Sequence, residues 1–176
     1  MSELATAVEA AETGTRVRLE PARMAEHGAR LFRAAYALCG SRHDAEDLVQ
    51  DTFERALRQP RFIRRDRDLP YLLSVLRRTW SAQAATAARR CTHPAPPEDF
   101  EWLPDEGPGQ QAALEARLAY AAMADLSEPL RMTIVAVDVV GLSYKEAARA
   151  LKTRKGTIMS RLFRAREQLA SALEPA

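Results

Sequence analysis

Apolar residues recur every three to four positions along most of this chain, which is the spacing of an amphipathic helix. One stripe begins at Ala29 and ends at Gly40, and a second follows Ser41, whose hydroxyl can cap a helix. The second stripe is uninterrupted and consists of Ala45, Leu48, Val49, Thr52, Phe53, Ala56 and Leu57. The pattern therefore predicts two consecutive helices separated by a glycine turn.

A short charged segment, residues 61–68, lies between Pro60 and Pro70. Its length and charge predict a loop outside the core. Pro70 suits the first turn of a further helix, which apolar residues predict as far as Arg90. Because no segment shows the alternation of a strand, we predict a wholly helical chain.

Four more helices are predicted in the C-terminal part of the chain. Their expected first or capping residues are Gln110, Ser127, Ser143 and Thr153. Gly141 ends the second of them, and Ser143 with Glu146 forms a capping box for a short helix that ends near Leu151. The apolar stripe of the last helix is Ile158, Leu162, Ala165, Leu169 and Leu173. A short helix, a tight turn and a longer basic helix are typical of a helix-turn-helix.

Proline content divides the chain into two units. Residues 91–109 hold five of the ten prolines and are acidic, which predicts a linker. They separate a first helical domain, 20–90, from a second, 110–176, and residues 1–19 are expected to form a flexible N-terminal arm. The predicted fold class is all-α, with two small helical domains joined by a Pro-rich acidic linker and a helix-turn-helix in the second.

The net charge of +2 conceals strong opposing blocks. Residues 58–90 carry 9 basic and 2 acidic side chains, and residues 131–167 carry 9 and 3. Between them, residues 91–130 carry 1 basic and 8 acidic side chains. Two basic blocks separated by an acidic stretch indicate two contacts with a polyanion, for which nucleic acid is the natural candidate.

Other classes of protein fit the sequence poorly. No apolar run is long enough to span a bilayer and no signal peptide is evident, so a cytoplasmic location is expected. Cys39 and Cys91 are expected to be free thiols. His43, Asp44, Glu46 and Asp47 could be imagined as metal or acid-base groups of a metal-dependent helical enzyme, but no second cluster completes such a site. We therefore expect no catalysis, cofactor, metal or small-molecule substrate.

Each basic block offers groups that suit nucleic acid. On the final helix, hydroxyl groups can hold phosphate and arginines can reach guanine, although a merely solvated basic face is the alternative. In block 61–90, arginines alternate with Phe62, Tyr71 and Trp80, a combination that holds opened nucleic acid. There the alternative is that the aromatic residues are core and the arginines only solvated.

The helix after Ser41 is acidic on the face away from its apolar stripe. Its carboxylates at helical spacing are Asp44, Asp47, Asp51 and Glu54, with Glu46 and Gln50 beside them. Like charges at this spacing destabilise a helix slightly. Such a strip is commonly only a solvated face. It can also serve a basic protein partner.

Two motifs resemble those of one protein family. Residues 44–53, Asp-Ala-Glu-Asp-Leu-Val-Gln-Asp-Thr-Phe, resemble the second region of bacterial sigma factors of the extracytoplasmic-function (ECF) group. Residues 141–148 together with 156–166 resemble the fourth region of that group. The resemblance covers about residues 20–90 and 110–173, and the two motifs are in the right order.

The resemblance implies an alternative sigma factor that joins core RNA polymerase and directs it to promoters. It implies that Asp47, Gln50, Asp51 and Glu54 dock on the β′ clamp helices. It implies that the −10 element is melted and bound by Phe62, Arg64, Arg65, Arg77, Arg78, Trp80 and Gln83. It implies that the −35 element is bound by Lys155, Thr157, Met159, Ser160, Arg161, Phe163 and Arg164.

Further partners follow from the same resemblance. Leu130 and Ile134 would face the β flap of the polymerase, and an anti-sigma factor, in some cases membrane-bound, would hold the chain inactive. The chain departs from the family at Arg78, often Asn, at Met159, often basic, and at Lys152, often Gly. The alternative function is a stand-alone helix-turn-helix regulator in which residues 20–90 serve as an effector or dimerisation module.

Overall fold

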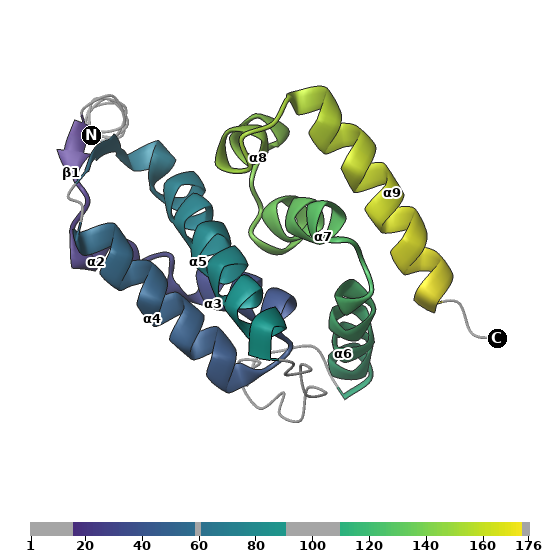
Figure 1. The fold of residues 1–176 in the computed structure, drawn as a ribbon. Helices are drawn as coiled ribbons and strands as arrows, with labels where there is room; N and C mark the ends of the chain where they lie inside the picture. The colour runs from purple at the N-terminus through teal and green to yellow at the C-terminus, as the bar shows by residue number, and fades with distance from the viewer. Residues whose placement is uncertain (1–15, 59–60, 91–109, 174–176) are drawn as a thin grey trace.

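The computed structural model describes residues 16–58, 61–90 and 110–173, and the helices of these ranges form two groups that lie side by side (Figure 1). The first group contains α2 (Pro21–Ala25), α3 (Gly28–Cys39), α4 (Arg42–Arg58) and α5 (Asp68–Arg90). The second contains α6 (Gln110–Ala124), α7 (Glu128–Ile134), η2 (Val135–Val139), α8 (Tyr144–Ala150) and α9 (Lys155–Leu173). The predicted two-domain helical class is confirmed, while the predicted linker 91–109 lies outside the described residues.

The first domain is built on the stripe that the sequence predicts. Helix α4 packs between α3 and α5 and buries Ala45, Leu48 and Ala56 completely or nearly so. Gly40 ends α3 with φ +72, a conformation that costs glycine little. Ser41 accepts a hydrogen bond from the Asp44 backbone N–H at 3.4 Å, so the predicted cap is present.

Two short strands contradict the prediction of a wholly helical chain. Strand β1 (Arg16–Arg18) pairs antiparallel with β2 (Phe62–Arg64), and a 3-10 turn, η1 (Arg65–Arg67), leads into α5. The segment predicted as a loop, 61–68, therefore contains a strand, a 3-10 turn and the first residue of α5, and the predicted arm does not extend to residue 19. Three-residue strands are too short for alternation to be visible in a sequence, and their pairing joins segments more than forty residues apart.

A buried ion pair fixes the start of α5. Arg23 in α2 donates from Nη2 and Nε to the two carboxylate oxygens of Asp68, at 2.6 and 2.9 Å. The Asp68 side chain is 1% exposed, so this part of segment 61–68 lies in the core, contrary to the prediction from charge. Burial raises the pKa of Asp68, and the hydrogen bonds and charge of Arg23 oppose that rise.

The second domain contains the predicted helix-turn-helix, α8 and α9. Ser143 and Glu146 form both hydrogen bonds of the capping box. Lys152 in the turn has φ +52, the left-handed conformation that glycine adopts more readily. Helix α9 begins at Lys155, and the carbonyl of Arg154 accepts from Ile158 N–H, so the predicted cap at Thr153 is misplaced by one residue.

Two details of this domain also differ from the sequence prediction. Ser127 occupies the N-cap position of α7, but its side chain makes no capping hydrogen bond. The predicted helix up to Gly141 ends in the wider turn η2, in which Val140 N–H donates to Val135 C=O. At the end of α9, Leu173 is 43% exposed, so the last member of the predicted stripe lies outside the core.

The two domains contact each other through described residues. The rings of Tyr36 in α3 and Tyr120 in α6 meet edge to face at 5.5 Å. Across α5 and α7, the Arg131 guanidinium lies 5.9 Å from the centre of the Trp80 ring. The Ser81 hydroxyl lies 3.3 Å from a carboxylate oxygen of Glu128, at the first position of α7. Region 16–90 and region 110–173 thus form one packed body here.

Cys39 lies at the end of α3, beside this contact, and its thiol is expected to be inert. Burial raises its pKa to about 12, with a further rise from the Asp44 carboxylate and an opposing effect of Arg131. Since the thiolate is the reactive species, a Cys91→Ser chain should react with a thiol reagent at pH 8 about a thousandfold more slowly when native than in denaturant. Cys39 is half-buried, and equal rates in stopped-flow labelling would contradict its raised pKa.

Candidate nucleic-acid and polymerase interfaces

Helix α9 presents an exposed face of mixed character to solvent. Ile158, Leu162 and Ala165 are buried against α7 and α8, and the exposed residues between them are Met159, Ser160, Phe163 and Arg164. Phe163 is 69% exposed and Met159 is 51% exposed, so both apolar side chains are available for contact. An exposed apolar pair on a basic helix suits contact with thymine methyl groups in a major groove.

The polar candidates on α9 divide into exposed and half-buried groups. Lys155, Ser160 and Arg164 are exposed, and Thr157 and Arg161 are half-buried. The Ser160 hydroxyl donates to the Thr157 carbonyl at 3.1 Å. One basic side chain of the helix is already engaged, since Arg166 donates to both carboxylate oxygens of Asp138 at 2.7 and 3.0 Å.

Phe62 is the most exposed aromatic candidate of the first domain, with 66% of its surface accessible. It lies on β2, so a strand holds the residue that the sequence places in a loop. Its neighbour Arg64 donates to Asp66 at 3.1 Å, and Arg65 donates to Glu26 at 3.0 Å. Both ion pairs are exposed, so they cost little to exchange for phosphate.

The candidates on α5 do not share one exposed surface. Arg78 is exposed, and its Nε donates to the Ser74 carbonyl at 3.1 Å. Arg77 and Trp80 are half-buried and face the second domain, where Trp80 contacts Arg131. Gln83 donates to the Asp51 carboxylate at 3.0 Å and so joins α5 to the acidic helix.

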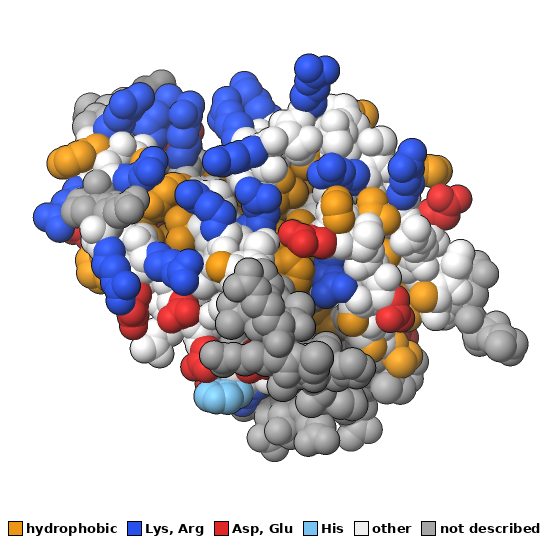
Figure 2. All heavy atoms as spheres, in the orientation of Figure 1, with side chains coloured by type: hydrophobic (Ala, Val, Ile, Leu, Met, Phe, Trp, Pro, Cys, Tyr) orange, Lys and Arg blue, Asp and Glu red, His pale blue; other side chains and the backbone are white. Residues whose placement is uncertain are grey.

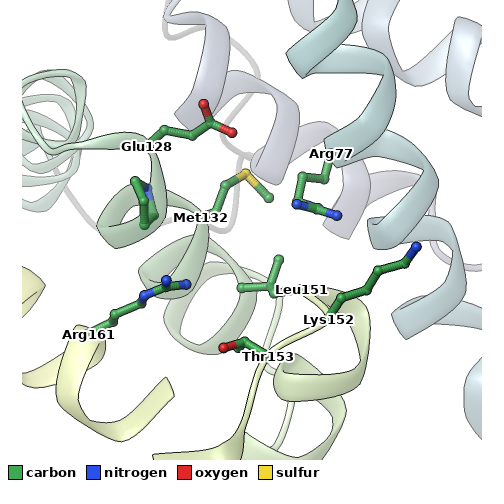
Figure 3. A pocket seen from close by; sticks show the side chains of 8 residues that line it. Arg77, Glu128, Met132, Leu151, Lys152, Thr153 and Arg161 are labelled. Atoms are coloured by element: carbon green, nitrogen blue, oxygen red, sulfur yellow. The ribbon is translucent and has the colours of Figure 1, made fainter. Parts of the chain in front are cut away.

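A cavity of about 270 Å³ lies between the domains and brings a −10 candidate close to a −35 candidate (Figure 3). Arg77 reaches it from α5 and Arg161 from α9, with Lys152 from the turn and Met132 and Leu151 between them. Arg77 Nε is buried and lacks a hydrogen-bond partner among the described residues. The two predicted DNA-binding surfaces therefore partly face each other in this arrangement.

The acidic strip on α4 is accessible over most of its length. Asp47, Gln50 and Glu54 are exposed, and Asp51 is half-buried through its bond with Gln83. Gln50 and Glu54 are joined by a hydrogen bond of 3.4 Å. Over the described residues, no group of three or more histidine, cysteine, aspartate or glutamate side chains could hold a metal ion.

Basic and acidic side chains are unevenly distributed over the face shown in Figure 2. Lys and Arg side chains gather over its upper part, above β1 and the start of α5 on the left and above α8 and α9 on the right. Acidic side chains are more frequent lower on this face. The basic surface thus extends over both domains.

The structure also changes the list of candidates. Ile134 is 3% exposed, so it cannot contact a polymerase flap in this conformation, whereas Leu130 is half-buried. Arg16 and Arg18 on β1 are exposed next to Phe62, although the sequence places them in the arm. A three-residue Arg-Val-Arg run offers no recognisable signal. No helix of the described ranges is long and apolar enough to cross a membrane.

Comparisons with known proteins match two separate parts of the chain to known families. The family model "Sigma-70 region 2" matches residues 24–90, and "Sigma-70, region 4" matches residues 116–169. The chain is 34% identical over 148 residues to ECF RNA polymerase sigma factor SigE of Mycolicibacterium smegmatis. That match covers 82% of this chain, which spans 57% of the relative's length.

Other relatives are covered more completely. ECF RNA polymerase sigma factor EcfG of Rhodopseudomonas palustris is 33% identical, over 79% of this chain and 76% of its own length. The fold is similar to the sigma factor RpoE of Bartonella quintana, solved in complex with the anti-sigma factor NepR, with a TM-score of 0.69 and 25% identity. That match covers 85% of this chain and 93% of RpoE. The chain belongs to the ECF group of RNA polymerase sigma factors.

Proposed function

We propose that this chain is an alternative sigma factor that binds core RNA polymerase and directs it to promoters with its own −10 and −35 elements. The observation that carries the proposal is the pair of basic surfaces, each with an exposed aromatic residue, on two domains that match sigma regions 2 and 4. A single binding surface would serve a stand-alone regulator. Two surfaces of different construction suit one opened and one double-stranded target.

The −10 element is proposed to bind around Phe62. Its exposed ring can stack on an unpaired base, while Arg64 and Arg65 exchange their exposed carboxylate partners for phosphates. Arg78 is exposed on α5 and extends this surface. Arg77, Trp80 and Gln83 are proposed to take part after the contacts with the second domain and with Asp51 are released.

The −35 element is proposed to bind in its major groove to the exposed face of α9. Lys155, Ser160 and the half-buried Thr157 lie near the start of the helix, where hydroxyl and ammonium groups hold phosphate. Arg161 and Arg164 can reach guanine, and Met159 and Phe163 can contact thymine methyl groups.

Replacing Arg164 by alanine should reduce −35 discrimination more than total affinity. A bidentate arginine contact is worth about 1–3 kcal/mol against the wrong base, or roughly 5- to 150-fold. Competition binding of the full chain with core polymerase to promoters varied at each −35 position measures this ratio. An unchanged sequence preference would place Arg164 on phosphate instead.

Simultaneous binding of both elements requires the domains to separate. Elements about 25 base pairs apart are separated by about 85 Å, whereas Arg77 and Arg161 here line one cavity. We propose that the arrangement described here is that of the free chain, and that polymerase binding separates the domains. An anti-sigma factor that keeps the surfaces covered is a proposed partner, supported by the RpoE–NepR complex.

Polymerase docking is proposed for the acidic strip on α4. Asp47 and Glu54 are exposed carboxylates on one face of a helix whose opposite face is buried, so the strip can meet basic helices without unfolding. The chain would act in the cytoplasm with the polymerase and would supply binding energy rather than catalysis.

Transcription from a promoter library tests this proposal against the stand-alone regulator. Purified chain is added to core polymerase, and transcripts are mapped with and without the chain. We expect a distinct set of start sites preceded by a common pair of elements. Duplex binding by the chain without any chain-dependent transcript would instead favour the stand-alone regulator.

A further inference from the structure

One face of the two-stranded ribbon formed by β1 and β2 is basic and aromatic. Arg16 lies opposite Arg64, Val17 opposite Ile63 and Arg18 opposite Phe62. Directly opposed residues of an antiparallel pair point to the same side, and alternate residues of one strand do so too. Arg16, Arg18, Phe62 and Arg64 therefore share one face, which we call the ribbon face.

The ribbon face is accessible and carries an electrostatic cost. Arg16, Arg18 and Phe62 are exposed, and like charges directly opposite each other, as in Arg16 and Arg64, destabilise a strand pair. Asp66 forms an ion pair with Arg64 and offsets the charge of that arginine, but not the charge of Arg16. Among the described residues, neither Arg16 nor Arg18 has an ion-pair partner. A bound anion would relieve this repulsion.

The ribbon is anchored to the domain at its base. Leu19, directly after β1, is 4% exposed, and its N–H donates to the Arg61 carbonyl at 3.0 Å. Arg23, held by Asp68, donates from Nη1 to the Arg18 carbonyl at 2.9 Å. The backbone that carries Arg18 is therefore tied to the same buried pair that fixes the start of α5.

We infer that the ribbon face binds the sugar-phosphate backbone of single-stranded DNA, with Arg16 and Arg18 on phosphates beside a base stacked on Phe62. The inference rests on the proposed role of Phe62 at the −10 element and adds two contacts to it. Strand β1 precedes residue 24, where the match to sigma region 2 begins, so the family match does not include these arginines. An exposed aromatic ring among arginines favours single strands over duplex.

The salt dependence of binding by the full chain tests this inference, because the ribbon face is exposed in the arrangement described here. The probe is a fluorescein-labelled oligothymidylate, and anisotropy is measured over a range of salt concentrations. Each phosphate contact on a single strand contributes about 0.7 to the slope of log K against log salt. An R16T/R18T chain, in which threonine retains a high strand propensity, should lose about 1.4 from that slope.

Matched variants separate charge from structure. An R16K/R18K chain keeps both charges and should keep the slope, as should R30Q/R42Q, which removes two exposed arginines from α3 and α4. A Phe62→Ala chain should bind more weakly with little change of slope. A wild-type slope in R16T/R18T, an equal loss in R30Q/R42Q, or no binding of the oligonucleotide by the wild-type chain would overturn the inference.

A crosslink supplies a readout that does not depend on the folding of a variant. Oligonucleotides containing 4-thiothymidine should crosslink to residues 16–18 and 62–64 of the wild-type chain, and crosslinks confined to other segments would overturn the inference. Promoter-dependent transcription is measured separately. If the wild-type chain directs transcription but R16T/R18T keeps the wild-type salt slope, only the ribbon contacts are rejected. If R16T/R18T has the reduced slope but the wild-type chain directs no transcription, only the proposed function is rejected.

Discussion

Replacing Arg23 by alanine is expected to lower the free energy of unfolding by about 3 kcal/mol or more, the largest stability change predicted for a single substitution here. The change leaves the Asp68 carboxylate, which is 1% exposed, without the guanidinium that donates two hydrogen bonds to it. It also removes the hydrogen bond to the Arg18 carbonyl. Urea unfolding of the full chain measures the loss.

The pH dependence of this loss identifies its cause. Burial raises the pKa of Asp68 and Arg23 opposes the rise, so the pKa rises further in the variant. A carboxyl whose folded-state pKa lies above its unfolded value destabilises the fold as pH rises through the folded-state pKa. The penalty should therefore be smaller at pH 4 than at pH 7, and an equal penalty at both would contradict an uncompensated carboxylate.

An exposed pair provides the control. Arg58 donates to Glu54 at 3.2 Å on the surface of α4, and Arg58→Ala should cost less than about 0.5 kcal/mol. Comparable losses for Arg23→Ala and Arg58→Ala would show that burial does not govern the difference.

Replacing Asp47 by arginine is expected to reduce binding to core polymerase by about 100-fold or more, because it sets a positive charge against a proposed basic docking surface. Asp47 is 60% exposed, so the fold should tolerate the change. Size-exclusion co-elution and fluorescence titration with core polymerase measure the effect. Affinity of the full chain for oligothymidylate and for duplex DNA should stay within about twofold.

Glu167→Arg is the matched control for this charge reversal. It introduces the same charge change at an exposed position of α9, outside the acidic strip. Equal loss of polymerase binding in both variants would point to net charge as the cause. Wild-type polymerase binding by Asp47→Arg would remove the acidic strip from the proposed docking surface.

Helical periodicity predicted the architecture because each helix buries its own apolar stripe. The stripe that begins at Ala45 and the capping box at Ser143 depend on residues within a few positions of each other, and both are confirmed. The exception is Leu57, the last predicted member of that stripe, which is 41% exposed. Family resemblance, rather than periodicity, supplied the identity of the two regions, and the matches to sigma regions 2 and 4 confirm it.

Long-range pairing was the part that the sequence could not predict. Arg23 and Asp68 are 45 positions apart, and a carboxylate in a charged segment indicates solvent rather than core. The same holds for β1, whose three residues become a strand only against β2. Trp80 and Arg77 sit within a basic block in the sequence, but their half-buried state depends on the packing of the second domain.

Strand opening at the −10 element distinguishes a sigma factor from a regulator that only binds duplex DNA. Permanganate modifies unpaired thymines, so a promoter from the library is treated with permanganate alone, with core polymerase, with the chain, and with both proteins. We expect reactive thymines at the −10 element only when both proteins are present. Protection of the duplex by the chain without any reactive thymine in the complete mixture would contradict it.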